Sequence, residues 1–138
     1  DLACDTLGDE ELKKQFAEMD LKISHNIQNI ALDNGALNNE RENDKIDKKR
    51  VWWVEAESVV GFINAYQHSG EKKFLESARS VWEYIKAEMI DKREGSEWYS
   101  EVSYDHKPHD WKEIVGPWKC PYHNGRMCME VINRGVDF

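Results

Sequence analysis

The clearest pattern in the chain is a repeat of apolar residues at spacings of three and four over residues 9–32. That spacing puts the apolar side chains on one face of an α-helix of about six turns. Asp9 can cap this helix, and Glu10 and Glu11 lie in its first turn, where the helix dipole favours negative charge. The repeat consists of Leu12, Phe16, Met19, Ile23, Ile27 and Ile30.

Two further repeats of the same kind predict helices over residues 51–69 and 71–90. The break at Ser69 and Gly70 is so short that the two helices should be antiparallel neighbours, an αα-hairpin. The apolar positions are Trp52, Trp53, Ala56, Val59, Val60, Ile63 and Tyr66 in the first helix, and Phe74, Leu75, Ala78, Val81, Trp82, Ile85 and Met89 in the second.

The two ends of the chain also have helical patterns. Residues 1–8 are typical of the tail of a preceding helix that stops at Gly8. This tail has no start signal, so the chain is expected to begin inside a larger fold. Residues 122–134 predict a last helix, with apolar Met127, Cys128, Val131 and Ile132.

The segments between the helices differ in character. Residues 33–50 are polar and rich in Asn, which predicts an exposed loop with a short extended piece at residues 35–37. Residues 97–104 instead alternate with period two, and this places Trp98, Val102 and Tyr104 on one face. We therefore predict a small β-hairpin and loop over residues 95–116.

The order of these elements predicts an all-α fold. Two antiparallel helix pairs follow one another at a period of about sixty residues, as in an α/α solenoid or toroid, where each pair buries its faces against its neighbours. A compact four-helix bundle is the alternative, but the wide apolar faces fit a closed ring of helix pairs better. The hairpin is then an insertion between two helices.

Composition narrows the class of protein. The 138 residues suffice for one domain, and the net charge of −8 argues against binding to nucleic acid, which needs clustered Lys and Arg. We find no apolar run long enough to span a bilayer, so we expect no membrane partner. The three cysteines lack metal-site spacing, which favours reduced thiols and a cytoplasmic location. Cys120 and Cys128 lie near His123; packing roles fit them better than reactivity does.

The chain also has six tryptophans, five tyrosines and four phenylalanines. These are more rings than a small core needs, and surplus rings commonly line concave sites for flat or sugar-like ligands.

Candidate chemistry is concentrated at residues 116–126, with the sequence GPWKCPYHNGR. Two prolines and two glycines shape this loop, which delivers His123 to the start of the last helix. An imidazole beside aromatic walls is suited to proton transfer near neutral pH, although it could equally act only as a helix cap. On the helix over residues 51–69, Glu57 lies one turn after Trp53. A ligand role is favoured for this carboxylate, with a structural salt bridge as the alternative.

Two further imidazoles stand at His106 and His109, whose spacing resembles that of metal ligands. Pro108 lies between them and no helix is expected there. A metal site is therefore not expected.

Three motifs together make the chain resemble a known family. They are WWVEAE at residues 52–57, GSEW at 95–98 and GPWKCPYHNGR at 116–126. With them, the chain is similar in order and spacing to the C-terminal part of the cellobiose 2-epimerases, in the N-acylglucosamine 2-epimerase superfamily. The resemblance implies an (α/α)6 barrel in which residues 1–138 form the C-terminal segment of a single catalytic domain.

The resemblance also implies roles for individual residues. Such enzymes invert C2 of the reducing-end glucose of β-1,4-linked disaccharides such as cellobiose, through ring opening and a cis-enediolate. His123 resembles the catalytic general acid/base and Trp118 an aromatic residue that holds the sugar. Glu57 and Trp52 resemble residues that orient the substrate and bracket its subsite, with Trp53 as packing or a second wall. This chemistry requires no cofactor and no metal.

One departure from the family pattern limits what the chain can do alone. The partner histidine of the family belongs to a His-x-x-Glu pattern on the eighth helix, and none of the histidines here stands in that pattern. We therefore expect the 138-residue chain to be inactive by itself and to need the N-terminal part of the same barrel. A non-catalytic carbohydrate-binding helical module and a structural helix bundle without a ligand are the alternatives.

Overall fold

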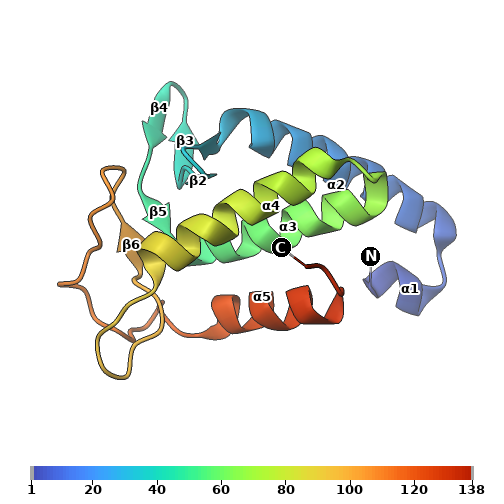
Figure 1. The fold of residues 1–138 in the computed structure, drawn as a ribbon. Helices are drawn as coiled ribbons and strands as arrows, with labels where there is room; N and C mark the ends of the chain where they lie inside the picture. Colours follow the sequence, from blue (N-terminus) through green and yellow to red (C-terminus); the bar gives the residue numbers. More distant parts are fainter. Residues whose placement is uncertain (1, 138) are drawn as a thin grey trace.

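Helix α3 (Trp52–Ser69) lies at the centre of the fold and packs against three other helices, α2, α4 and α5. The structure is a computed structural model that describes residues 2–137. Asp1 and Phe138, which the sequence-based boundaries include, lie outside the described residues. In Figure 1, α3 and α4 run side by side, with α2 on one side of them and α5 on the other.

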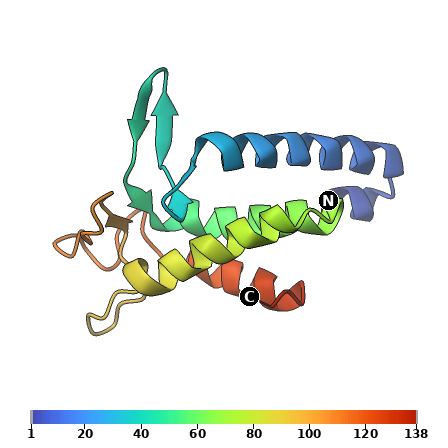
Figure 2. The ribbon, with the colours of Figure 1, turned by 45° about the horizontal axis from the view of Figure 1, so that its top comes forward.

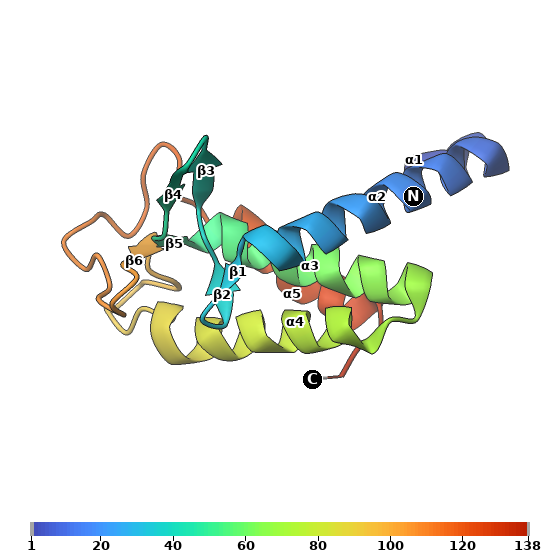
Figure 3. The same cartoon turned by 90° about the horizontal axis from the view of Figure 1, so that it is seen from above.

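Helix α2 (Glu10–Ile30) follows the short helix α1 (Leu2–Leu7). Asp9 caps α2 as expected, because its side chain accepts a hydrogen bond from the Leu12 amide at 2.9 Å. The apolar stripe of α2 is largely uncovered: the exposed fractions of Phe16, Met19 and Ile23 are 42%, 52% and 49%. Figure 3 shows α2 crossing over α3 and extending with α1 beyond the other helices.

Helices α3 and α4 (Lys72–Tyr84) form the expected αα-hairpin, and α4 continues as a π-helix, η1 (Ile85–Met89). Gly70 ends α3 with φ of 73°, a left-handed conformation that favours glycine. The apolar stripes of this hairpin make most of the core. Its fully buried members include Ala56, Val59, Ile63, Phe74, Ala78, Val81, Ile85 and Met89.

Helix α5 (Tyr122–Asn133) packs on the face of α3 that α4 leaves open. Met127 is buried in the core, and Val131 is partly buried against it. Figure 2 shows α5 as a separate layer beneath α3 and α4. Among the residues the structure describes, no helix is long and apolar enough to cross a membrane.

The segment between α2 and α3 contains more strand than its sequence predicts. The extended piece at residues 35–37 is confirmed as β2 (Ala36–Leu37), which pairs with β1 (Leu32–Asp33). The segment predicted as loop also holds a projecting hairpin of β3 (Glu40–Glu42) and β4 (Lys45–Asp47), visible in Figure 2. Charged residues dominate its strands, so they lack the apolar alternation by which strands are recognised.

The hairpin predicted within residues 95–116 is present as a short antiparallel bridge between Val102 and Pro108, and its first arm also pairs outside this range. Strand β6 (Glu101–Val102) pairs with β5 (Arg50–Val51), which immediately precedes α3. Of the three side chains predicted to share one face, Trp98 and Val102 are buried and Tyr104 is exposed. The partner of β6 comes from some fifty residues earlier in the chain. Period-two alternation identifies a strand and one buried face, and it carries no information about which strand lies beside it.

Candidate active site

Glu57 and His123 meet where α3 packs against α5. His123 is the second residue of α5, directly after the loop that was expected to deliver it. Its Nδ1 lies 2.7 Å from Oε1 of Glu57, although 66 residues separate the two in sequence. Both side chains are about one-third exposed, so the pair remains accessible from outside. The sequence left a ligand role and a salt bridge open for Glu57, and the geometry is that of an ion pair on an accessible site.

Arg126 completes this cluster from the next turn of α5. Its guanidinium forms an ion pair with Oε2 of Glu57, the carboxylate oxygen that does not face His123. Partial burial would raise the pKa of Glu57, but hydrogen bonds from Arg126 and His123 outweigh it, and the pKa is lowered. Glu57 is therefore a carboxylate at neutral pH.

The ionised carboxylate determines which nitrogen of His123 carries the proton. A carboxylate only accepts hydrogen bonds, so Nδ1 must be the donor. In the neutral imidazole, Nε2 then has a free lone pair and can accept a proton. The arrangement suits a general acid/base.

Aromatic rings surround this imidazole. The ring centroid of Trp53 lies 6.0 Å from that of His123, and Tyr122 contacts His123 edge-on at 5.1 Å and 82°. The Tyr122 ring also lies 5.2 Å from the guanidinium carbon of Arg126. Trp53 is 43% exposed, so its indole can still contact a ligand.

A groove of about 330 Å³ between α2, α3 and the β2 region opens beside this cluster. Glu57 and Trp53 contribute to its wall, and Asn38 and Asn39 add amide groups to an otherwise mainly apolar lining. The groove therefore combines apolar walls with a few polar groups, as ligand sites commonly do.

A second cleft, of about 470 Å³, lies among the loops before α5. Its lining consists of Trp52, Ser100, Glu101, Trp111, Lys112, Glu113, Trp118 and Lys119. Trp52 is 8% exposed and belongs to the core, whereas Trp118 is 89% exposed. The structure thus brings Trp53, Glu57 and His123 together and places Trp52 and Trp118 at this other cleft.

Sequence reasoning assigned no role to Arg126 or to Tyr122. Arg126 stands three residues after His123, a spacing that puts the two on one helix face, so this signal was present. The sequence-based prediction also missed Glu55. This residue is fully buried in α3 and accepts hydrogen bonds from the Leu37 amide at 3.0 and 3.2 Å. Nothing local distinguishes this buried carboxylate from the exposed ones around it.

His106 and His109 each lie beside a different carboxylate. Nδ1 of His106 lies 3.5 Å from Glu88, and Nδ1 of His109 lies 3.1 Å from Glu101. Within residues 2–137, no group of three or more potential ligands is arranged to hold a metal ion.

Comparison with known proteins identifies the family of the chain. The profile of the N-acylglucosamine 2-epimerase (GlcNAc 2-epimerase) family matches residues 16–125, which is most of the sequence. The chain belongs to this family. A curated cellobiose 2-epimerase from Ruminococcus albus is 80% identical over 137 residues, which are 99% of this chain and 35% of the relative. One from Dictyoglomus turgidum is 45% identical over 128 residues, or 93% of this chain and 33% of the relative.

Solved structures agree with this assignment. A sugar epimerase from a ruminal bacterium matches with a TM-score of 0.95 at 80% identity, over 99% of this chain and 35% of the other. Cellobiose 2-epimerase from Bacillus thermoamylovorans matches with a TM-score of 0.88 at 46% identity, over 96% of this chain and 34% of the other. The expected family and fold class, helix pairs that form part of an (α/α)6 barrel, are confirmed. The chain spans about a third of the length of these relatives.

Proposed function

We propose that this chain supplies one side of the active site of a cellobiose 2-epimerase. The observation that carries the proposal is the 2.7 Å contact between Nδ1 of His123 and the Glu57 carboxylate, beside an exposed indole. Its support outside the chain is the 80% identity to a protein named cellobiose 2-epimerase. The remaining two thirds of such a barrel would supply the rest of the site.

In this scheme, His123 acts on the ring-opened sugar through Nε2. One base removes the proton from C2, and the electron pair moves onto the C1 carbonyl oxygen to give a cis-enediolate. A second group returns a proton to C2 from the opposite face, which inverts the configuration and leaves no net change in atoms or charge. Glu57 keeps Nδ1 protonated throughout, so that His123 can alternate between accepting and donating at Nε2.

The aromatic residues would bind the sugar around this step. The exposed ring of Trp53 next to His123 can stack on the apolar CH face of a pyranose. Trp118, at the second cleft, would contact a sugar unit farther from the reacting carbon, whereas Trp52, which is only 8% exposed, would contribute a small part of the wall. This division fits a disaccharide substrate, because the chain provides aromatic surface at two separate places.

The test uses a hybrid enzyme in which these 138 residues replace the matching third of the Ruminococcus albus enzyme. We expect the hybrid to epimerise cellobiose, and His123→Asn to lower kcat by roughly a hundredfold or more. His106→Asn is the matched control, because His106 has φ of 61°, which asparagine tolerates, and lies outside this cluster. The 138-residue chain alone should show no turnover.

Two results would contradict the proposal. Unchanged epimerisation in the His123→Asn hybrid would remove His123 from the mechanism. Cellobiose binding without turnover in the hybrid would favour the second candidate, a carbohydrate-binding module, which the exposed Trp111 and Trp118 at the second cleft also support.

A further inference from the structure

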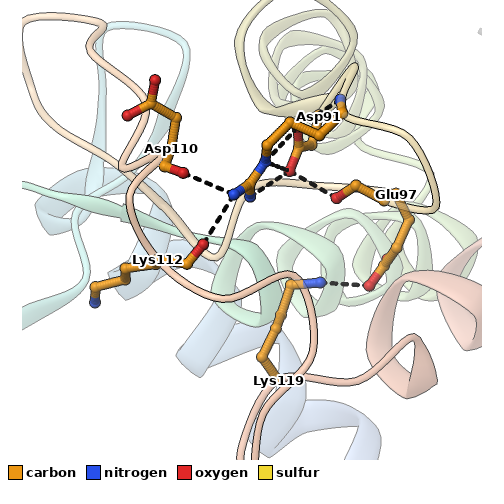
Figure 4. A network of polar contacts seen from close by, with 7 residues as sticks. Asp91, Glu97, Asp110, Lys112 and Lys119 are labelled. Carbon is orange, nitrogen blue, oxygen red and sulfur yellow. Dashed lines mark hydrogen bonds and ion pairs between the residues drawn. The ribbon is translucent and has the colours of Figure 1, made fainter.

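The loop between β6 and α5 has little regular structure and carries exposed aromatic side chains. Trp111 and Trp118 are 75% and 89% exposed, so their own packing does little to fix them. The position of either indole at the second cleft therefore depends on the backbone to which it is attached. That backbone is held by a short segment, residues 91–97, which follows η1 (Figure 4).

Arg93 is the first anchor. Its Nη1 donates hydrogen bonds to the carbonyl oxygens of Asp110 at 2.6 Å and Lys112 at 2.9 Å. These carbonyls lie on either side of Trp111, so one guanidinium fixes the backbone that carries this indole.

The guanidinium is itself held from the other side by Asp91. Its Nε and Nη2 lie 2.8 and 2.6 Å from Oδ2 of Asp91, a carboxylate that is buried. Ser96 and the Arg93 amide also donate to this carboxylate. The pKa of Asp91 is lowered to about 2, mainly by the hydrogen bonds from Arg93, although burial acts in the opposite direction. Asp91 is therefore ionised at neutral pH.

Lys119 is the second anchor. This lysine is 5% exposed and forms an ion pair with Glu97, as Figure 4 shows. It directly follows Trp118, and its carbonyl accepts a hydrogen bond from the Gly116 amide at 3.0 Å. The Glu97 carbonyl in turn accepts from the Asp91 amide at 3.0 Å. Both anchors therefore connect the loop to the same segment, residues 91–97. Arg93 holds the loop before Trp118, and Glu97 holds it just after Trp118 through Lys119.

We propose that Arg93 is a positioning residue that holds the loop of Trp111 and Trp118 in place for substrate, with Lys119 as the second point of attachment. This inference rests on the proposed function, in which Trp118 binds the sugar. Arg93 acts through the loop, and His123 has its own support from Glu57 and the packing of α5 on α3. Loss of Arg93 should therefore weaken substrate binding more than it slows proton transfer.

The experiment is a double-mutant cycle in the hybrid enzyme. We expect Arg93→Ala to raise KM for cellobiose about tenfold while kcat stays within about threefold. Trp118→Ala should raise KM as well, and adding Arg93→Ala to it should change KM little further, because both act on one interaction. Arg93→Lys should give an intermediate KM, since an ammonium keeps the charge beside Asp91 but cannot reach the carboxylate and both carbonyls.

The matched control is Gln28→Ala, which removes hydrogen bonds from α2 to Ser77 and to the Lys73 carbonyl, away from this loop. It should lower Tm without changing KM. The inference is overturned if folded Arg93→Ala or Arg93→Lys hybrids keep the parental KM, or if the effects of Arg93 and Trp118 on KM are additive. The proposed function fails separately, by an inactive hybrid or an indifferent His123→Asn variant.

Discussion

At the scale of single residues, two glutamates on one turn of α3 have opposite environments. Glu57 is partly exposed and paired with His123 and Arg126, and its pKa is lowered. Glu55 is buried, and loss of hydration raises its pKa to about 8 despite hydrogen bonds from Leu37 and the charge of Arg50. Two positions along a helix correspond to a rotation of about 200°, which separates a surface carboxylate from a core one.

The environment of Glu57 predicts the effect of its amide variant. In the hybrid enzyme, Glu57→Gln should lower kcat roughly 10- to 100-fold, because a glutamine amide can also donate to Nδ1 and no longer enforces the proton there. KM should change less than kcat. Steady-state kinetics on cellobiose measure both, and an unchanged kcat would mean that the contact is only structural.

The environment of Glu55 predicts a dependence of stability on pH. Between the unfolded pKa of about 4.5 and the folded pKa of about 8, the native state holds a proton that the unfolded state has released. Stability from this group is therefore present at low pH and is lost as pH rises through that window.

Glu55→Gln removes this titration and keeps an oxygen for the Leu37 amide. As pH rises from 5 to 9, the free energy of unfolding of the variant hybrid should increase relative to that of the parent by on the order of a few kcal/mol. Thermal unfolding across that range measures the difference. Parallel curves for the two proteins would show that Glu55 does not titrate there.

At the scale of elements, helix ends and helix interiors use glycine differently. Gly70 ends α3 with φ of 73°, where a Cβ is strained, whereas Gly61 lies inside the same helix. Apart from the chain neighbours and the local helix backbone, no atom of the described residues lies within 4 Å of a Cβ built at either position. Backbone conformation alone therefore distinguishes the two sites.

Alanine should have opposite effects at these positions. Gly70→Ala should destabilise the hybrid by about 1 kcal/mol, since alanine resists the left-handed conformation. Gly61→Ala should stabilise it by roughly 0.5–1 kcal/mol through helix propensity. Denaturant unfolding measures both, and two shifts of the same sign would contradict this account.

At the scale of the whole molecule, the uncovered face of α2 is the largest departure from an ordinary core. Its stripe was predicted correctly from spacing, yet Phe16, Met19, Ile23 and Ile30 are all more than 40% exposed. The chain spans about a third of the length of its relatives. We infer that further helices of the barrel cover this face.

A charge on that face tests the inference. In the hybrid, Ile23→Asp should lower the free energy of unfolding by roughly 2 kcal/mol or more, because the substitution would bury an unpaired carboxylate. Lys22→Asp, at the neighbouring exposed position, is the control and should change stability by less than about 0.5 kcal/mol. Equal unfolding midpoints for the two variants would mean that the face stays in water.

Patterns among near neighbours in the sequence were enough to locate the helices and to indicate the family. Apolar spacing located α2, α3, α4 and α5 to within a few residues, because periodicity and capping act between near neighbours. The motifs around Trp52 and His123 sufficed for the resemblance. The order of the elements was enough to indicate paired helices.

The three-dimensional structure was needed to learn which residues contact one another. It paired His123 with Glu57 and β6 with β5, and it separated Trp53 from Trp52, its neighbour in sequence. It also buried Glu55 and joined Arg93 to the loop of Trp118. Such contacts depend on how helices pack against one another, and that packing sums many weak, non-local interactions that no stretch of sequence contains.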